Sequence, residues 1–189
     1  MKILAVCSGR KEGNSTSMVN YAINGIHDVS KNVEIIHLRS MDISFCDGCL
    51  SCDETGLCHI DDDMTSIIAN IDKYNAFVFA TPARWSLLSG DMKVFMDRLN
   101  PLAVSNKLEG KKAIIFVVGQ SEEDDVDSIK TAADSVRFFC ENANIEVIKS
   151  IVATDCLAPN AVLAKKNILL DCQVALEKLI DSLEKDNAG

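Results

Sequence analysis

Three short segments of the chain are continuously apolar: Ile3–Cys7, Ala76–Ala80 and Ala113–Val118. Between them lie stretches in which apolar residues recur at the spacing of an α-helix. A strand without polar positions has to be covered on both faces, as in a parallel sheet between two layers of helices. The alternation of the two patterns therefore predicts an α/β fold made of strand–helix–strand units.

Two more segments, Val33–Leu38 and Ile145–Lys149, place charged or polar residues between apolar ones. This pattern is typical of strands with one less covered side, so we expect them at the edges of the sheet. With the continuously apolar strands in the centre, the simplest right-handed arrangement is a flavodoxin-like, doubly wound sheet of five parallel strands in the order 2-1-3-4-5. Its topological switch point lies between strands one and three, which predicts a ligand on the loops 8–16 and 81–90.

The predicted helices carry their apolar residues on one face, at a spacing typical of helices that pack on a sheet. The residues of these faces are Met18, Ala22 and Ile26; Met92, Phe95, Met96 and Leu99; Val126, Ile129, Ala133, Val136 and Cys140; and Ile168, Cys172, Ala175, Leu176, Leu179 and Leu183. Cys140 and Cys172 are accordingly expected to be buried structural thiols. A further helix is expected to begin at residues 61–64, where aspartates would cap its positively polarised N-terminus.

Length, charge and hydropathy limit the classes of protein to which the chain can belong. Its 189 residues, 48% of them hydrophobic, suit one globular domain over residues 1–189. A formal net charge of −9 disfavours nucleic acid and anionic membranes as partners, because no basic stripe is present to neutralise phosphates. The longest apolar run cannot span a bilayer and no signal-peptide pattern follows Met1, so we expect a cytoplasmic protein.

A run of four cysteines, C-x2-C-x2-C-x5-C, lies between the second predicted strand and the helix that follows. It consists of Cys46, Cys49, Cys52 and Cys58, and residues 46–58 form a Cys-rich insertion longer than the usual connection. Each two-residue gap lets the backbone turn and direct the next sulfur to the same centre, which favours a [4Fe–4S] cluster. The last gap of five residues and the lack of a following proline differ from the bacterial ferredoxin pattern, and a single run implies a single cluster.

Two other uses of these cysteines stay open. Disulfides would require an oxidising compartment, which nothing else in the chain indicates. Zinc is the stronger alternative, although structural zinc sites usually take their ligands from two separated pairs of residues.

A polar loop follows the first predicted strand and leads directly into a helix. Its hydroxyl, amide and guanidinium groups belong to Ser8, Arg10, Asn14, Ser15 and Thr16. Together with the free N–H groups at the start of the helix, they suit a terminal phosphate. The loop lacks the Walker pattern and the G-x-G-x-x-G spacing, so a mononucleotide fits better than a dinucleotide. The alternative is a helix that is simply capped by Asn or Ser.

A second loop follows the third predicted strand and contains the only tryptophan of the chain. It spans residues 81–90, and its candidate binding residues are Thr81, Pro82, Ala83, Arg84 and Trp85. The backbone amides of this proline turn can hydrogen-bond the polar rim of a flat heterocycle, and Trp85 can pack against its face. A lone tryptophan is more often a packing residue, so the hypothesis depends on the position of the loop at the switch point. A third loop, beginning at Gly119, can close the pocket from the same edge.

Taken together, these motifs make the chain similar to the NAD(P)H-dependent FMN reductase superfamily, and specifically to its iron–sulfur flavoproteins. The segment from Ser8 to Thr16 resembles the family's FMN-phosphate loop, and the segment from Thr81 to Gly90, with residues 97–99, resembles its isoalloxazine loop. The cysteine run matches the iron–sulfur branch, so the resemblance implies that all four cysteines are cluster ligands. It covers almost the whole chain and also implies a homodimer or homotetramer, with the flavin of one protomer near the cluster of another.

The expected function is that of an FMN-dependent iron–sulfur flavoprotein that transfers electrons between FMN and a [4Fe–4S] cluster. NAD(P)H is a candidate electron donor, and the expected partners are a small redox molecule or an electron-carrier protein such as a ferredoxin. No catalytic residue is predicted, because the flavin ring itself carries the chemistry. At Ala83 and Arg84 many relatives have a bulkier aliphatic and an aromatic residue, so flavin electronics or substrate access is expected to differ.

Two alternatives accompany this hypothesis. The first is a cluster-free NAD(P)H-dependent FMN reductase that acts on quinones, nitro compounds, metal oxyanions or free flavin. The second is a non-enzymatic interaction module in which the four cysteines hold zinc and the sheet docks a partner.

Overall fold

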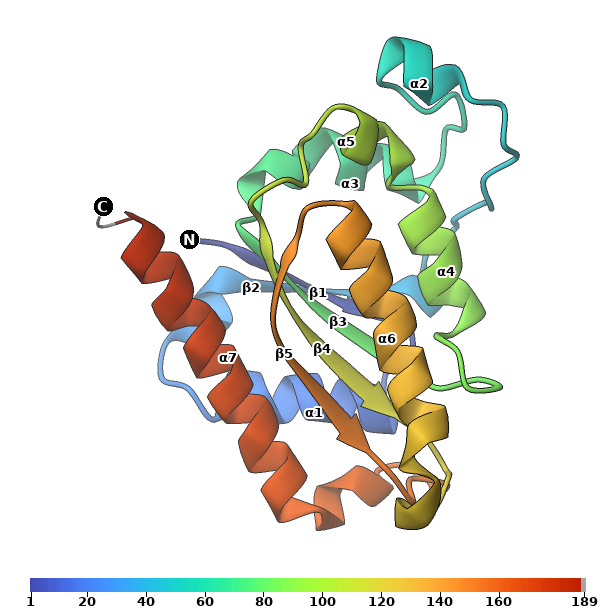
Figure 1. Cartoon of the computed structure of the whole chain (residues 1–189). Coiled ribbons are helices and arrows are strands. Elements are labelled where there is room, and N and C mark those ends of the chain that lie inside the picture. Colours follow the sequence, from blue (N-terminus) through green and yellow to red (C-terminus); the bar gives the residue numbers. More distant parts are fainter. Residues whose placement is uncertain (188–189) are drawn as a thin grey trace.

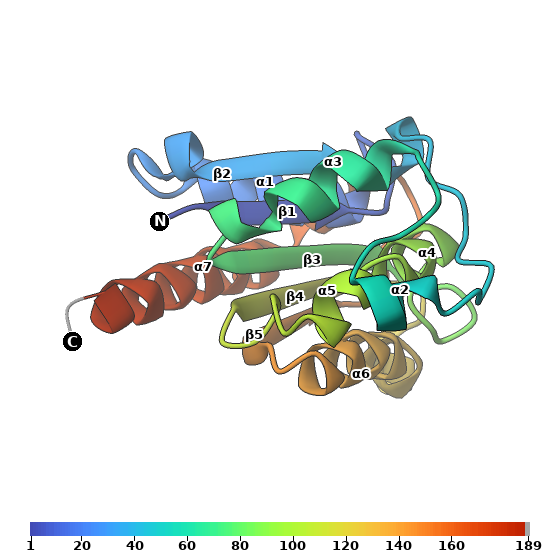
Figure 2. The same ribbon diagram turned by 90° about the horizontal axis from the view of Figure 1, so that it is seen from above.

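The computed structural model describes residues 1–187, which contain one five-stranded parallel sheet (Figure 1). Its strands are β1 (Ile3–Cys7), β2 (Val33–His37), β3 (Ala76–Pro82), β4 (Lys112–Val118) and β5 (Glu146–Ala153). They lie side by side in the order β2-β1-β3-β4-β5, and every pair is parallel (Figure 2). The flavodoxin-like order predicted from the apolar patterns is therefore confirmed.

The central strands are buried along their length. Every residue of β1 and β4 is shielded from solvent, and so is every residue of β3 except Pro82. The edge strand β2 is only partly covered, as its mixed pattern predicts. Side-chain burial in this sheet thus follows the polarity of each segment.

The other edge strand, β5, is longer than its sequence pattern predicts. The expected strand ended at Lys149, whereas the observed one spans Glu146–Ala153. Its register against β4 shifts between Ala113 and Ile114, and Ile148 faces no residue of β4. A bulge of this kind inverts the alternation of inward and outward side chains. A prediction based on a strict two-residue period therefore ends the strand at the bulge.

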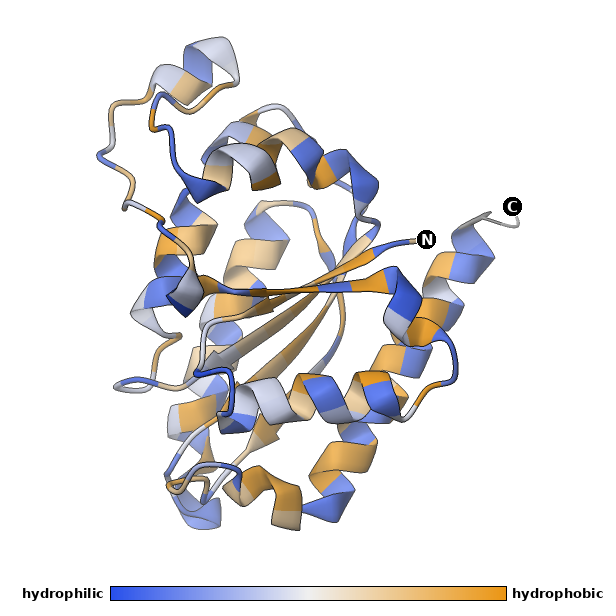
Figure 3. Ribbon diagram, turned by 180° about the vertical axis from the view of Figure 1, so that it is seen from behind, coloured by the Kyte–Doolittle hydropathy of each residue, from blue (hydrophilic) through white to orange (hydrophobic). Residues whose placement is uncertain are grey.

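The described residues contain seven helices. They are α1 (Asn14–Asn24), α2 (Ser51–Thr55), α3 (Asp63–Asn70), α4 (Gly90–Asp97), α5 (Asn100–Val104), α6 (Val126–Asn142) and α7 (Lys166–Asn187). All of them except α2 cover the sheet. Apolar side chains of α1 and α7 pack on one face, and those of α3, α4, α5 and α6 belong to the core on the other. Figure 3 shows hydrophobic residues concentrated along the strands, with hydrophilic residues interspersed on the helices. Within residues 1–187, none of these helices has the length and apolar character that a bilayer span requires.

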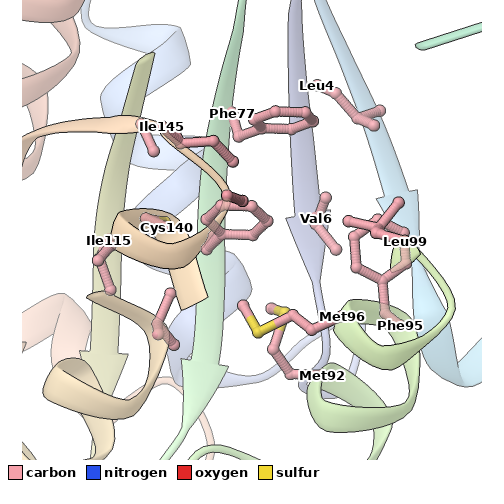
Figure 4. Close-up of a cluster of buried hydrophobic side chains, with 14 of the residues drawn as sticks. Leu4, Val6, Phe77, Met92, Phe95, Met96, Leu99, Ile115, Cys140 and Ile145 are labelled. Atoms are coloured by element: carbon pink, nitrogen blue, oxygen red, sulfur yellow. The ribbon is translucent and has the colours of Figure 1, made fainter. Parts of the chain in front are cut away.

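The predicted helix faces supply much of the core. Met92, Phe95 and Met96 of α4 pack with Leu4 and Val6 of β1 in one buried cluster (Figure 4). The face predicted for the first helix is correct at its start, but α1 ends at Asn24, so Ile26 lies beyond the helix. Ile26 nevertheless packs, partly buried, against the opposite core cluster.

The two cysteines predicted to be structural lie in these cores. Cys140 on α6 and Cys172 on α7 are fully buried. Burial raises the pKa of each thiol to about 12. Because only the thiolate is a good ligand or nucleophile, these sulfurs act as apolar packing groups near neutral pH.

The Cys-rich insertion lies outside the two layers of helices that cover the faces of the sheet. Its short helix α2 stands away from the sheet beside α5 (Figure 1). The helix that follows begins at Asp63, with Asp62 as its N-cap: the Asp62 carboxylate accepts from the N–H of Met64 at 2.9 Å. The expected aspartate cap of this helix is therefore confirmed.

Candidate functional site

The loops at the carboxyl ends of the strands surround a cavity of about 920 Å³. This is the edge at which a topological switch point places a ligand, and the volume is in the range of small-molecule and cofactor sites. Nine of the residues predicted to bind a cofactor line the cavity: Ser8, Arg10, Asn14, Ser15, Pro82, Ala83, Arg84, Trp85 and Gly119. Thr16 and Thr81 do not line it.

Buried hydroxyl groups hold the loops of this cavity together. Thr16 Oγ1 donates to the carbonyl oxygen of Arg10 at 2.9 Å, and Thr81 Oγ1 accepts from the N–H of Ser89 at 3.0 Å. Ser89 Oγ donates to Ser8 Oγ at 2.8 Å and also caps α4. Sequence analysis placed Ser89 in the segment that resembles the isoalloxazine loop but did not name it as a site residue, although Ser-Gly-Asp before an apolar helix is an N-cap signal.

The first turn of α1 faces the cavity without a side-chain cap. Its N-cap residue is Gly13, which excludes the alternative of a helix capped by Asn or Ser. The leading N–H groups of a helix have no partner within the helix, so such an end favours an anion. The loop also packs tightly, because a Cβ at Gly9 would collide with Ser15 Oγ.

Asn14 makes hydrogen bonds that the sequence does not reveal. Its Nδ2 donates to the carbonyl oxygens of Cys156 at 3.1 Å and Ala158 at 2.8 Å, and its Oδ1 accepts from the N–H of Val162 at 3.0 Å. Both N–H bonds of the amide are thereby engaged. Asn14 ties the segment after β5 to the start of α1, and its contribution to a phosphate site comes through the position of that segment.

Trp85 occupies the tip of a tight hairpin at the rim of the cavity. Arg84 and Leu87 exchange backbone hydrogen bonds of 2.8 and 3.0 Å, while Trp85 and Ser86 between them have φ angles of 49° and 61°. Two consecutive left-handed residues are typical of a type I′ turn, in which Asn-Gly is the usual pair. The Trp85 residue is 99% exposed, so the expected packing of its ring against a ligand stays a prediction.

Two parts of the cavity wall were not anticipated. One is the apolar group Leu38, Met41 and Ile43 after β2, and the other follows β5 and includes Cys156 and Leu157. Neither segment carries a polar motif, so nothing in its local pattern distinguishes a ligand wall from ordinary packing. Their apolar side chains give the cavity surfaces suited to a flat ring.

The four cysteines of the run meet at a second, smaller cavity. Cys46, Cys49, Cys52 and Cys58 all line it, and all are free thiols. Leu50, Leu57 and Pro101 add apolar wall. Four sulfur donors around one small, partly open cavity fit an iron–sulfur cluster, and the free thiols do not support the disulfide alternative.

Polar neighbours surround these sulfurs. Asn100 Nδ2 donates to Cys52 Sγ at 3.0 Å, and Cys49 Sγ lies 2.9 Å from Ser51 Oγ. The ligand atoms of Asp47, Cys49 and His59 lie within 4.8 Å of one another, as the donors of a metal ion would. Hydrogen bonds, first from the backbone N–H of Cys49, lower the pKa of Asp47.

Arg98 is buried at the base of the Cys-rich insertion. Its guanidinium pairs with both oxygens of Asp62 at 2.5 and 3.0 Å, and donates to the carbonyl oxygens of Ser44 at 2.7 Å and Ile60 at 3.3 Å. Burial opposes the charged form, but Asp62 and Cys58 outweigh it and raise the pKa of Arg98. The sequence resemblance placed residues 97–99 at the isoalloxazine loop; in the structure Asp97 and Arg98 line the cysteine cavity instead.

The chain matches the model of the NADPH-dependent FMN reductase family over residues 1–133. It is 32% identical over 122 residues to the iron-sulfur flavoprotein MJ1083 of Methanocaldococcus jannaschii, covering 64% of this chain and 63% of the relative. It is 31% identical over 120 residues to an iron-sulfur flavoprotein of Archaeoglobus fulgidus, covering 61% of this chain and 54% of that one. The matched region thus spans less than two thirds of the length of either relative.

Solved structures share the fold at low sequence identity. The NAD(P)H:quinone oxidoreductase from Methanothermobacter marburgensis has a TM-score of 0.72 at 14% identity, covering 93% of this chain and 94% of its own. The FMN-dependent NADH-azoreductase from Bacillus anthracis, solved in complex with FMN, has a TM-score of 0.67 at 15% identity, covering 95% and 99%. These likenesses confirm the sheet topology of the present chain.

Proposed function

Because the chain belongs to the NADPH-dependent FMN reductase family, we propose that it is an FMN-dependent oxidoreductase of the iron–sulfur flavoprotein type. One observation carries the proposal: four thiols from one short insertion line a common cavity, on a chain whose switch point holds a second cavity of cofactor size. Two such spaces in one fold suit two redox cofactors.

The larger cavity provides the groups that FMN requires. Arg10, the Ser8 and Ser15 hydroxyls and the start of α1 would hold the phosphate. The turn at residues 82–85, with the backbone at Gly119, would receive the isoalloxazine ring. When bound, FMN would accept a hydride equivalent from a donor such as NAD(P)H and deliver electrons singly.

The smaller cavity would hold a [4Fe–4S] cluster on the four cysteine thiolates. Helix α4 connects the two sites, since its N-cap Ser89 lines the larger cavity and Arg98 at its other end lines the smaller one. Eight helical residues at ~1.5 Å each make this connection about 12 Å long. The proposed partners are a small-molecule oxidant or reductant and an electron-carrier protein such as a ferredoxin, with the active assembly a homodimer or homotetramer.

Zinc binding is the second candidate function, and the grouping of Asp47, Cys49 and His59 favours it. A carboxylate, a thiolate and an imidazole are all common zinc ligands. On this alternative the insertion would be a structural zinc loop, and the protein would be a flavin reductase without a cluster or a binding module.

Composition of the anaerobically purified protein tests these candidates. We would record its ultraviolet–visible spectrum and measure iron, acid-labile sulfide, zinc and FMN per chain. About four irons and four sulfides with one FMN would support the proposal. FMN without iron would favour a cluster-free reductase, and zinc without flavin would leave only the interaction module.

A further inference from the structure

Two N–H donors reach the cysteine cavity from outside the cysteine run. Arg98 follows α4 and Asn100 begins α5, and both line the cavity together with Cys52 and Cys58. Neither belongs to the insertion, and neither is a metal ligand. Helices α4 and α5 are held in place by their side chains in the buried core cluster. Arg98 and Asn100 therefore hold their N–H donors in fixed positions next to the sulfurs.

Asn100 contacts a sulfur directly. Its Nδ2 lies 3.0 Å from Cys52 Sγ and 3.2 Å from Asp53 Oδ1. The amide nitrogen of Asn100 therefore has two acceptors, both in the insertion. A deprotonated Cys52 that ligates iron is a stronger acceptor than a thiol, so this hydrogen bond gains strength on cluster binding.

Arg98 has one N–H group left over. Its Nη atoms bind Asp62 and two backbone carbonyls, but Nε has no partner among the described residues, although it is buried. The Arg98 residue is 1% exposed, and it lines the same small cavity as Cys58. Leaving a buried N–H without an acceptor is energetically unfavourable, so such a group calls for an acceptor that completes the site.

We infer that Arg98 and Asn100 are positioning residues that set the reduction potential of the cluster, by presenting N–H groups to the sulfurs of Cys58 and Cys52. The inference rests on the proposed function, because it needs a cluster on these cysteines. One-electron reduction adds one negative charge to the cluster and its thiolates. Hydrogen bonds to the sulfurs stabilise that charge, so each donor favours the reduced form and raises the potential.

The test is a redox titration of the anaerobically purified full chain, followed by electron paramagnetic resonance, with iron and FMN contents measured alongside. Asn100→Leu removes the amide at similar volume, Asn100→Gln retains it, and Asn142→Leu makes the same change on the exposed face of α6. We expect Asn100→Leu to shift the cluster equilibrium toward the oxidised form by about three- to tenfold. Tenfold corresponds to a midpoint about 59 mV lower for one electron. Asn100→Gln should recover part of the shift, and Asn142→Leu should show none.

Arg98→Lys provides the second measurement. Lysine keeps the positive charge, but it cannot form the bidentate hydrogen bonds to Asp62 and it lacks the Nε donor. We expect a lower midpoint in the iron-loaded fraction of this variant, with FMN content unchanged. An iron-loaded Asn100→Leu and Arg98→Lys that both keep the wild-type midpoint would overturn the inference and leave the proposed function intact. Wild-type protein without iron and sulfide would overturn both.

Discussion

Arg98 and Asp62 form a buried, bidentate ion pair, with Nη1–Oδ2 and Nη2–Oδ1 distances of 2.5 and 3.0 Å. Their side chains are only 1% and 5% exposed. Asp62 also accepts from the N–H of Ser44, and Arg98 donates to the carbonyl oxygens on either side of the cysteine run. The pair therefore joins both ends of the insertion to the end of α4.

Asp62→Asn should destabilise the protein. Removing one partner of a buried ion pair leaves the other charge uncompensated, which typically costs about 3–5 kcal/mol in the free energy of unfolding. Urea denaturation followed by circular dichroism measures the change. The matched control is Asp72→Asn, which breaks the exposed pair with Lys107 and should cost less than about 1 kcal/mol.

The same pair makes the stability depend on pH. Burial raises the pKa of Asp62, but the hydrogen bonds of Arg98 and the backbone N–H groups outweigh it and lower that pKa overall. The ion pair therefore contributes its full stabilisation above the pKa of Asp62 in the unfolded chain, about 3.9. This stabilisation is lost as the pH falls through the lower pKa of Asp62 in the folded protein. The stability difference between wild type and Asp62→Asn should shrink below about pH 4. A difference that stays constant down to pH 2 would contradict this assignment.

Cys49→Ser should remove most of the iron and leave FMN bound. The serine oxygen is a poor substitute for a thiolate ligand, whereas the FMN cavity is formed by other loops. Iron, sulfide and FMN analysis per chain measures the effect. Cys156→Ser, a substitution in the wall of the larger cavity, should keep its iron. Full iron and an unaltered spectrum in Cys49→Ser would show that the ligand assignment is wrong.

Arg10→Ala should weaken FMN binding by about tenfold or more, because a charge-assisted hydrogen bond contributes about 1.5–3 kcal/mol. Fluorescence titration of the apoprotein with FMN gives the dissociation constant. Riboflavin, which lacks the phosphate, should lose much less affinity in the same variant. Equal losses for FMN and riboflavin would place Arg10 away from the phosphate.

Asn14→Ala should loosen the segment that follows β5. The variant removes the hydrogen bonds to Cys156, Ala158 and Val162. We expect faster hydrogen exchange of the Val162 amide, whose N–H loses its acceptor, and a weaker FMN complex. Ser17→Ala is the control, because it removes a bond to Asn160 and one to the carbonyl oxygen of Gly13 but none to Cys156, Ala158 or Val162. Unchanged protection at Val162 would mean that the segment is held by its apolar packing alone.

Trp85→Gly should not destabilise the protein. Glycine adopts the positive φ angle of this position without strain, and the exposed indole ring has no packing to lose. Relief of the positive-φ strain offsets the larger conformational entropy that glycine loses on folding, so the free energy of unfolding should change by less than about 1 kcal/mol. In wild type, FMN binding should quench the fluorescence of this single tryptophan. Loss of stability together with unquenched fluorescence would assign Trp85 a structural role apart from the ligand.

The sheet order could be predicted from the sequence because the polarity of each segment indicates how deeply it is buried. Continuously apolar strands belong in the centre of a parallel sheet, and strands with charged residues belong at its edges, so five segments were enough to order the sheet. The aspartate cap at Asp62 and the buried thiols Cys140 and Cys172 were readable for the same reason. The end of β5 was not, because a bulge breaks the period on which the prediction depends.

The long-range hydrogen bonds could not be predicted from any local sequence pattern. The sequence alone identified the loop after β1 as polar and the cysteines as closely spaced. It did not show that Asn14 binds the segment 156–162, or that Arg98 faces the cysteine cavity instead of the flavin loop. Periodicity tells which face of an element is buried, whereas the partner of a buried polar atom depends on which distant segments meet. That meeting follows from the packing of helices on both faces of the sheet, and only the folded chain shows which polar groups satisfy one another.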